Sequence, residues 1–363
     1  MKVTGYRLHR WGGELQWEGF DLPDPQPGEA LIRVEACGIG LTVLNCIRGD
    51  LANDAARLPR VPGHEIVGRV ERVGAEHAGR TLPRRDEAVG EVGSGSLVAV
   101  GQRVMAYFYL VCGRCPACRS GNDSLCGNLA GWIGVHRDGG YAPYAVLPAR
   151  NLVPLPDSIP AAQATAIPDA IATPLHVCKT RAGVQARDRV AVIGAGGGVG
   201  IHMVEMAKLF GAQVAGLEAS ETKFQAITEM GGTPVLSRSF DEIDLRTVWD
   251  APTATVVIDL LGTRESAAWG LTSLALGGRF VALTTFRDVD VPMSPRDLVL
   301  RELTVLGSRY ASKAELAESA DLVAAGKIHP IVSHVVPPEQ VGEVHDALRD
   351  GTLVGRGAVD WNV

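Results

Sequence analysis

The sharpest change in the pattern of apolar and polar residues falls in the stretch 189–223. Residues 190–193 form an unbroken apolar run, which is typical of a strand buried on both faces. Residues 194–200 are almost all glycine and favour neither helix nor strand. Apolar residues then recur at helical spacing over 201–209, and a second apolar run ends at Glu218. We predict a strand, a glycine turn, a helix and a second strand that ends in an acid.

This order of elements is that of a dinucleotide-binding unit. Glycines let the backbone approach a pyrophosphate, which the free N–H groups and dipole of the following helix attract. Glu218 stands 24 residues after Gly194 (218 − 194), near the distance at which an acid reaches the ribose hydroxyls. A glycine-rich loop alone also serves as a plain turn. The prediction therefore depends on the strand before the glycines, the helix after them and the acid at the end of the second strand, each at the expected spacing.

The rest of the chain shows two patterns of apolar and polar residues. Short alternating runs between turn residues predict a β-rich domain before and after the dinucleotide unit, which itself alternates strands with helices and so predicts a parallel sheet. Strands are expected at 31–36, 66–73, 104–111, 144–147, 255–261, 279–284, 303–308, 329–336 and 354–359, and helices at about 160–182, 314–325 and 339–349. The fold class is α/β, with a doubly wound parallel sheet of the Rossmann type and a β-rich domain.

The segment 74–101 interrupts this pattern, because it is rich in Arg, Glu and Gly and has little apolar periodicity. We interpret it as a solvated surface excursion, with a lid or a partner contact as the alternative.

Composition narrows the class of protein. The 363 residues are enough for two domains, and 46% hydrophobic with 21% charged residues is ordinary for a globular protein. A net charge of −6 gives no electrostatic basis for binding nucleic acid. No signal peptide or membrane-spanning run is visible, so we expect a cytoplasmic protein that does not bind membranes. Its seven cysteines are then ligands or free thiols.

Four of these cysteines follow one another in the pattern C-x2-C-x2-C-x7-C. Cys112, Cys115, Cys118 and Cys126 can surround one zinc ion with four thiolates and leave no open position. Such a site is structural, because a closed shell has no place for a substrate. The alternative is four unrelated thiols.

The residues described so far, together with Gly63-His64-Glu65 and the closing Val354-Gly355-Arg356, resemble the zinc-type alcohol dehydrogenases of the medium-chain dehydrogenase/reductase superfamily. The resemblance covers essentially the whole chain except the excursion. It implies a GroES-like catalytic domain over 1–165 and 306–363 that carries the zinc loop 112–126, and a Rossmann domain over 166–305. It also implies a small-molecule substrate, and we expect a homodimer or homotetramer.

The resemblance assigns cofactor contacts one position at a time. Glu218 falls on the family's ribose-binding acid, and Lys223 falls on a lysine that touches the same ribose. The acid would repel the 2′-phosphate of NADP(H), so NAD(H) is favoured over NADP(H). The remaining cofactor residues are Thr173 beside the nicotinamide, Gly194, Gly197, Gly198, Val199 and Gly200 of the turn, and Arg356 near the pyrophosphate. The turn is one residue longer than the family's common form.

The catalytic metal site of the family is incomplete in this chain. His64 and Glu65 are present and Asp169 falls on the third ligand, but Gly40 occupies the position of the first cysteine. Thr42 matches the hydroxyl that relays the substrate proton. Three interpretations follow: a weak second zinc site at His64, Glu65 and Asp169; a zinc-free active site; or loss of redox chemistry.

We expect an NAD(H)-dependent oxidoreductase that moves hydride between nicotinamide and an alcohol, a carbonyl or an activated alkene, without a catalytic zinc. Thr42, His64 and Asp169 would be its catalytic residues, and Phe108 and Trp132 would line the substrate pocket. One alternative is a zinc-independent enoyl or quinone reductase, and another is a non-redox lyase or binding protein that retains NAD. One structural zinc per chain is expected, and Gly40→Cys should add a second by restoring the thiolate.

Overall fold

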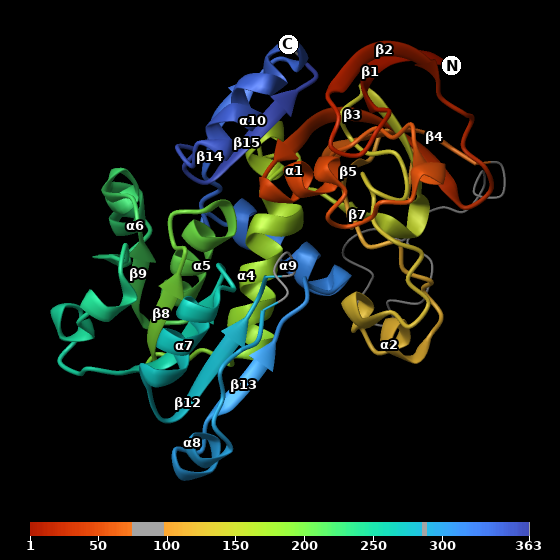
Figure 1. The fold of residues 1–363 in the computed structure, drawn as a ribbon. Helices are drawn as coiled ribbons and strands as arrows, with labels where there is room; N and C mark the ends of the chain where they lie inside the picture. Colours follow the sequence, from red (N-terminus) through yellow and green to blue (C-terminus); the bar gives the residue numbers. More distant parts are fainter. Residues whose placement is uncertain (75–97, 285–288, 363) are drawn as a thin grey trace. The chain divides into compact units, whose positions relative to one another are not determined.

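The computed structural model describes residues 1–74, 98–284 and 289–362 (Figure 1). Its contacts divide the chain into two compact units. The first unit comprises Met1–Pro168, Ala311–Ala324 and Val332–Val363, and the second comprises Asp169–Tyr310 and Ala325–Ile331. Most of the polar segment 74–101, interpreted from the sequence as a surface excursion, lies outside the described residues.

The second unit is built on a six-stranded parallel sheet in the order β10-β9-β8-β11-β12-β13. The four apolar residues of β8 after Arg189 are completely buried, which confirms the burial on both faces predicted from the sequence. The strands are β8 Arg189–Ile193, β9 Gln213–Glu218, β10 Thr233–Leu236, β11 Ala254–Asp259, β12 Leu274–Ala282 and β13 Thr304–Gly307.

Helices cover this sheet in the manner of a doubly wound fold. Helix α5 packs on β8 and β9, and α7 packs on β11 and β12, as Figure 1 shows. The core between them includes Leu217, Val257, Leu271 and Phe280. The helices of this unit are α4 Ala172–Leu175, α5 Gly198–Leu209, α6 Phe224–Glu229, α7 Arg264–Thr272 and α8 Pro295–Leu300.

The end of the dinucleotide unit differs from the sequence-based expectation. Strand β13 pairs in parallel with β12, from Arg279↔Thr304 to Ala282↔Gly307. The expected boundary at 305/306 would cut this strand in half. The sheet keeps β13 because its backbone groups are paired there, so the unit continues to Tyr310.

The first unit contains the β-rich part of the chain. A hairpin of β1 Lys2–Leu8 and β2 Leu15–Asp21 accompanies a sheet in the order β14-β15-β3-β4-β5-β7, with β6 pairing to β3. The strands of the sheet are β3 Glu29–Ile39, β4 Glu65–Val73, β5 Arg103–Ala106, β6 Tyr144–Pro148, β7 Leu152–Pro154, β14 Val332–Val336 and β15 Arg356–Asp360. Strand β3 pairs antiparallel with β4, β6 and β15, so it brings distant parts of the sequence together.

The α-helices of this unit within the described ranges are α1 Leu41–Arg48, α2 Pro116–Arg119, α3 Ala161–Ala164, α9 Lys313–Ala324 and α10 Val341–Arg349. The strand expected over 104–111 ends at Ala106. Beyond it the side-chain amide of Asn151 donates to the carbonyl oxygens of Tyr107 and Tyr109, both at 2.6 Å, and takes the place of a neighbouring strand. None of the helices in the described ranges is long and apolar enough to cross a membrane.

Candidate functional site

The glycine turn lies between β8 and α5, as the sequence predicted. Gly194 has φ +80°, a conformation that strongly favours glycine, and it turns the chain at the carboxyl end of β8. Gly197 is the N-cap of α5 and has no side chain to occupy the helix terminus, and Gly198 to Gly200 form the first turn. The first N–H groups of a helix have no partner within it, so this end of α5 suits an anionic phosphate.

Glu218 ends β9 beside this turn, and the structure shows how its carboxylate is positioned. One oxygen accepts a hydrogen bond from the N–H of Gly196 at 2.9 Å. The other accepts from the N–H groups of Ala219 and Ser220 at 2.9 and 3.1 Å. Three backbone donors thus fix the orientation of the carboxylate, as a group that binds ribose hydroxyls requires.

Gly196 was absent from the residues assigned to the cofactor, yet its lack of a side chain is essential here. A Cβ at this position would lie 2.6 Å from both Oε2 of Glu218 and Cδ of Lys223. Glycine at 196 therefore lets the acid and the lysine approach the turn. The run of glycines was a signal for this, but only the contact shows which of them serves it.

Asp169 and Thr173 lie one helical turn apart in the second unit. Residues Ile167–Ile171 form a π-helical turn that leads into α4. The hydroxyl of Thr173 donates to Oδ1 of Asp169 at 3.0 Å. The predicted catalytic acid and the predicted nicotinamide contact are thus directly linked, and π-helical turns are frequent at functional sites.

The four cysteines of the 112–126 loop converge, with all their sulfur atoms within 4.8 Å of one another. Sγ of Cys115 lies 3.5 Å from that of Cys118 and 3.9 Å from that of Cys126. A tetrahedral zinc with bonds of about 2.3 Å places its sulfur ligands about 3.8 Å apart. The geometry and chemistry of these donors therefore fit a closed zinc site.

Backbone N–H groups prepare this loop for a cation. They lower the pKa of Cys112 to about 6, mainly through the N–H of Arg114, and lower the pKa of Cys115 through the N–H of Cys118. A thiolate is the form that binds metal, so the backbone favours the ligand state at Cys112 and Cys115, whereas burial raises the pKa of Cys118 to about 12.

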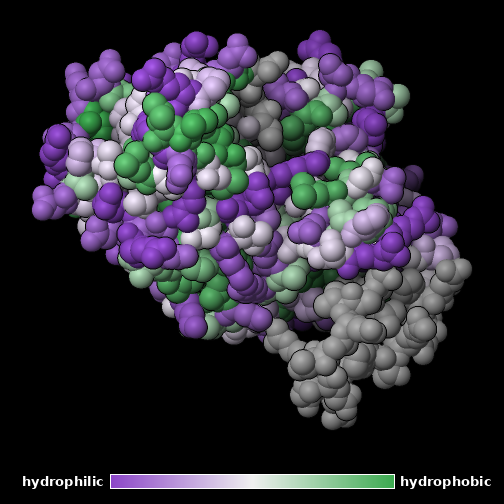
Figure 2. All heavy atoms as spheres, turned by 90° about the horizontal axis from the view of Figure 1, so that it is seen from below, coloured by the Kyte–Doolittle hydropathy of each residue, from purple (hydrophilic) through white to green (hydrophobic). Residues whose placement is uncertain are grey.

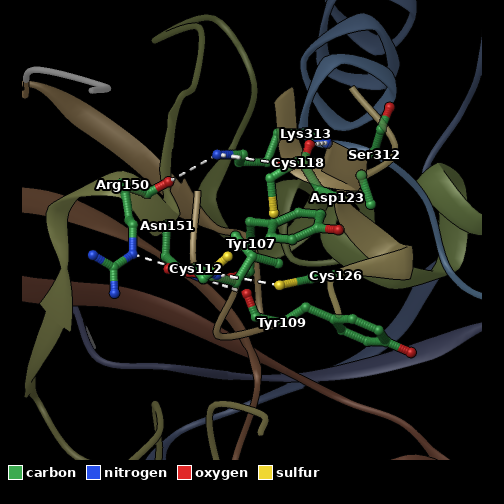
Figure 3. Close-up of polar contacts among 12 residues, drawn as sticks. Tyr107, Tyr109, Cys112, Cys118, Asp123, Cys126, Arg150, Asn151, Ser312 and Lys313 are labelled. Carbon is green, nitrogen blue, oxygen red and sulfur yellow. Dashed lines mark hydrogen bonds and ion pairs between the residues drawn. The ribbon is translucent and has the colours of Figure 1, made fainter. Parts of the chain in front are cut away.

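The loop is also tied to the rest of the first unit (Figure 3). Asp123 accepts the N–H of Lys313 at 3.2 Å and lies 3.7 Å from its ammonium group, which docks the start of α9 on the loop. Arg150 donates to the carbonyl of Val111 at 3.0 Å. These contacts tie the loop to residues almost 200 positions away in the chain.

The expected catalytic corner lies in the first unit where β3, β4 and β15 meet. Gly40 follows β3 and precedes Thr42 in α1, His64 is buried just before β4, and Glu65 begins β4. Nη2 of Arg356 donates to Oε1 of Glu65 at 2.5 Å. The imidazole and carboxylates of His64, Glu65 and Asp169 are suitable zinc donors in kind. The residues around Gly40 nevertheless fit the metal poorly, because the thiolate is missing and Glu65 already binds a cation.

A series of aromatic rings extends from this corner. The ring of His64 meets that of Phe108 edge-on at 4.7 Å, and Phe108 meets Tyr109 at 5.0 Å. Tyr109 then meets Trp132 at 6.0 Å. Of the two predicted pocket residues, Phe108 contacts His64 directly, and Trp132 is connected to it through Tyr109 and Phe108.

A cavity of about 310 Å³ lies elsewhere in the second unit. Its lining includes Asp188, Thr255, Arg279 and Thr304, at the amino-terminal ends of the strands. Parallel sheets bind ligands at their carboxyl ends. Asp188 is moreover paired with Arg279 at 2.5 Å, so this cavity contains structural charges.

The fold indicates a dehydrogenase that uses a dinucleotide, with a loop whose four cysteines could hold a zinc ion. Two family models match: the alcohol dehydrogenase GroES-like domain over residues 26–157 and the zinc-binding dehydrogenase domain over 198–325. The chain belongs to the zinc-type alcohol dehydrogenases of the medium-chain dehydrogenase/reductase superfamily, which are oxidoreductases. The resemblance recognised in the sequence is confirmed.

Similar proteins include an alcohol dehydrogenase of Geobacillus stearothermophilus, 30% identical over 94% of this chain and 95% of the relative. An acryloyl-coenzyme A reductase of Sulfurisphaera tokodaii is 28% identical over 93% of this chain and 94% of its own. The crystal structure of an NAD-dependent alcohol dehydrogenase matches with a TM-score of 0.85 and 28% identity, over 98% of this chain and 99% of the other.

Proposed function

We propose that this protein is an NAD(H)-dependent oxidoreductase that acts on an alcohol, a carbonyl or an activated alkene without a catalytic zinc. The observation that carries the proposal is the Glu218 carboxylate, held by three N–H groups beside the glycine turn. It presents acceptors for two ribose hydroxyls where NADP(H) would place a phosphate. Lys223, Thr173 and Arg356 complete the proposed cofactor contacts.

The cofactor preference is tested at Glu218. We expect Glu218→Asn to weaken NADH binding about 10- to 100-fold, because hydrogen bonds to a charged group contribute roughly 1.5–3 kcal/mol. Glu218→Asp, which keeps the charge, is the matched control and should retain the preference for NADH over NADPH. Fluorescence titration with both cofactors measures it. Equal affinity of the natural protein for the two would refute the proposal.

The chemistry is assigned to three residues. NAD(H), when bound, supplies or accepts the hydride. Thr42 offers a hydroxyl for proton transfer at the start of α1, and His64 offers an imidazole that can serve as acid or base. Asp169, which accepts a hydrogen bond from Thr173, is the third member. His64→Ala should lower turnover at least tenfold, whereas unchanged turnover would make His64 a remnant of a lost metal site.

Reduction of an activated alkene is the second candidate, favoured by the likeness to an acryloyl-coenzyme A reductase. A steady-state assay of NADH oxidation with ketones and with enoyl thioesters, and of NAD⁺ reduction with secondary alcohols, separates the two. Turnover of ketones and alcohols alone would support the dehydrogenase, and turnover of the thioesters alone would support the reductase.

One structural zinc per chain, at Cys112, Cys115, Cys118 and Cys126, is part of the proposal. Its support is the convergence of four sulfur atoms with lowered pKa values at Cys112 and Cys115. Elemental analysis of the dialysed protein should give about one zinc per chain.

The protein is further proposed to form a homodimer through β13. This strand ends the sheet order, and an edge strand presents backbone groups that a second copy can pair with. Exposed apolar residues lie nearby, with Val299 and Leu300 of α8 73% and 65% exposed. Figure 2, seen from the end of Figure 1 where α8 lies, shows apolar side chains gathered on this face. Light scattering of Val305→Pro, which removes one N–H from β13, should show a shift to monomer.

A further inference from the structure

Two glycines at the end of β3 have ordinary backbone conformations. Gly40 has φ −134° and ψ 176°, an extended geometry that any residue adopts, and Gly38 lies within the strand. The backbone therefore gives no reason for glycine at either position. The reason must be the space that a side chain would occupy.

That space is filled by a buried ion pair. A Cβ at Gly38 would overlap the carboxylate of Glu65 and lie 2.9 Å from its Cβ. A Cβ at Gly40 would overlap Nη1 of Arg356 and lie 2.6 Å from Cζ. Glu65 and Arg356 are 0% and 3% exposed, and their side chains are hydrogen-bonded. The glycines thus leave room for the carboxylate and for the guanidinium, respectively.

The neighbouring strands hold this arrangement in place. Gly38 pairs with Glu65 between β3 and β4, and Ile39 pairs with Gly357 between β3 and β15. The guanidinium therefore reaches its position from a strand whose register is set by β3. It is positively charged at every working pH and has no lone pair with which to bind a metal.

We propose that the Arg356 guanidinium, held by Glu65 in the space beside Gly40, is the resident cation of this corner and keeps a divalent metal ion out of it. A metal bound at His64 and Glu65 would have to share the Glu65 carboxylate with a fixed positive charge, which repels it. The inference gives Arg356 a role beyond the pyrophosphate contact. It deepens the proposed function and rests on it for the claim that the reaction needs no catalytic metal.

The same geometry changes the expected result of restoring the cysteine. A thiolate at position 40 needs a Cβ where Nη1 of Arg356 now lies. Gly40→Cys alone should therefore lower the melting temperature and leave the zinc content at about one per chain. The sequence alone had predicted a gain of zinc from this substitution.

The experiment measures zinc per chain and melting temperature for four proteins: the natural chain, Gly40→Ala, Gly40→Cys, and Gly40→Cys combined with Arg356→Gln. Gly40→Ala is the matched control, because it adds the same Cβ without a ligand. We expect the two single variants to lose melting temperature by similar amounts and to retain about one zinc. The combined variant, freed of the cation, should rise toward two.

Several results would overturn the inference. A second zinc in the natural protein, or in Gly40→Cys at full melting temperature, would show that the guanidinium does not exclude metal. An unchanged melting temperature in Gly40→Ala would show that no crowding exists, and this result remains decisive if the combined variant fails to fold. A folded combined variant with about one zinc would show that another group excludes the metal. No substrate enters these measurements, so failure of the proposed activity is detected separately, in the NADH assay.

Discussion

The four-cysteine loop and the corner at Gly40 are the two places where this family holds zinc, and in this chain they have diverged. The loop retains every ligand, and its sulfur atoms lie at the separation that a tetrahedral ion needs. The corner has lost its thiolate, and a buried ion pair between Arg356 and Glu65 occupies the vacated space. The loop keeps the ligands of a metal ion, whereas at the corner the guanidinium of Arg356 supplies the positive charge instead of a metal ion.

Donor atoms alone do not make a metal site. Cys112 and Cys115 have lowered pKa values because N–H groups favour their thiolates, so two of the four cysteines favour the form that binds a cation. Glu65 has a carboxylate of the right kind, but that carboxylate already neutralises a guanidinium. A metal site must therefore supply donor atoms that are not already paired with another cation.

The largest effect is expected from breaking the loop. Cys115→Ser should remove the zinc and destabilise the first unit by about 4–5 kcal/mol or more, because loss of a structural metal is among the most damaging changes to a fold. Denaturant unfolding and elemental analysis measure the two effects. Arg119→Ala, an exposed change in the same loop, should stay within about 0.5 kcal/mol. Full stability and zinc content in Cys115→Ser would contradict the assignment.

The next largest effect is expected at the corner. Arg356→Met should cost about 3–5 kcal/mol, because it leaves the Glu65 carboxylate buried without its cation. Adding Glu65→Gln should restore much of the loss, since the pair is then neutral. Denaturant unfolding of both single variants and the double variant completes the cycle, and strictly additive losses would argue against a coupled pair. Zinc bound in the loop should remain throughout, in contrast to Cys115→Ser.

A smaller effect on stability depends on pH and arises from the buried side chain of His345, near the corner at Gly40. His345 is hydrogen-bonded to Tyr141, with 2.9 Å between Tyr141 Oη and His345 Nε2, and Tyr141 packs beside Gly63, which precedes His64. The pKa of His345 is lowered from 6.5 to about 4, mainly by burial and also by the charge of Arg349, while Asp346 opposes the shift. Between these values the unfolded chain binds a proton that the folded chain does not. Stability is therefore complete above the unfolded pKa and falls as the pH approaches 4.

The expected loss from His345 is about 2 kcal/mol between pH 7 and pH 5, at about 1.4 kcal/mol per unit of pKa shift. Denaturant unfolding at the two values measures it. His345→Gln, which cannot take up a proton in this range, is the control and should show a flatter pH dependence. An identical pH dependence in both proteins would exclude His345 as the source, and would leave the thiolates of the loop as the acid-sensitive groups.

The sequence predicted most of what is local. The dinucleotide unit lies within 189–223, where a buried strand, a glycine turn and an acid are close neighbours in the chain. The cysteine loop is similarly short, and the spacing of its ligands is enough to indicate a tetrahedral site. The strand over 104–111 was predicted too long, because side-chain bonds from Asn151 are invisible in an apolar run.

The family, the cofactor unit and the four-cysteine loop can be recognised in the amino-acid sequence, since each depends on residues whose spacing along the chain sets their geometry. The presence of glycine at position 40 is explained only by the packing of the folded chain. Arg356 comes 316 residues later (356 − 40), and it reaches Gly40 because β3 pairs with both β4 and β15. A missing ligand is visible in a sequence, but the group that fills its space is visible only when distant strands are packed together, because close packing leaves no cavity of that size empty.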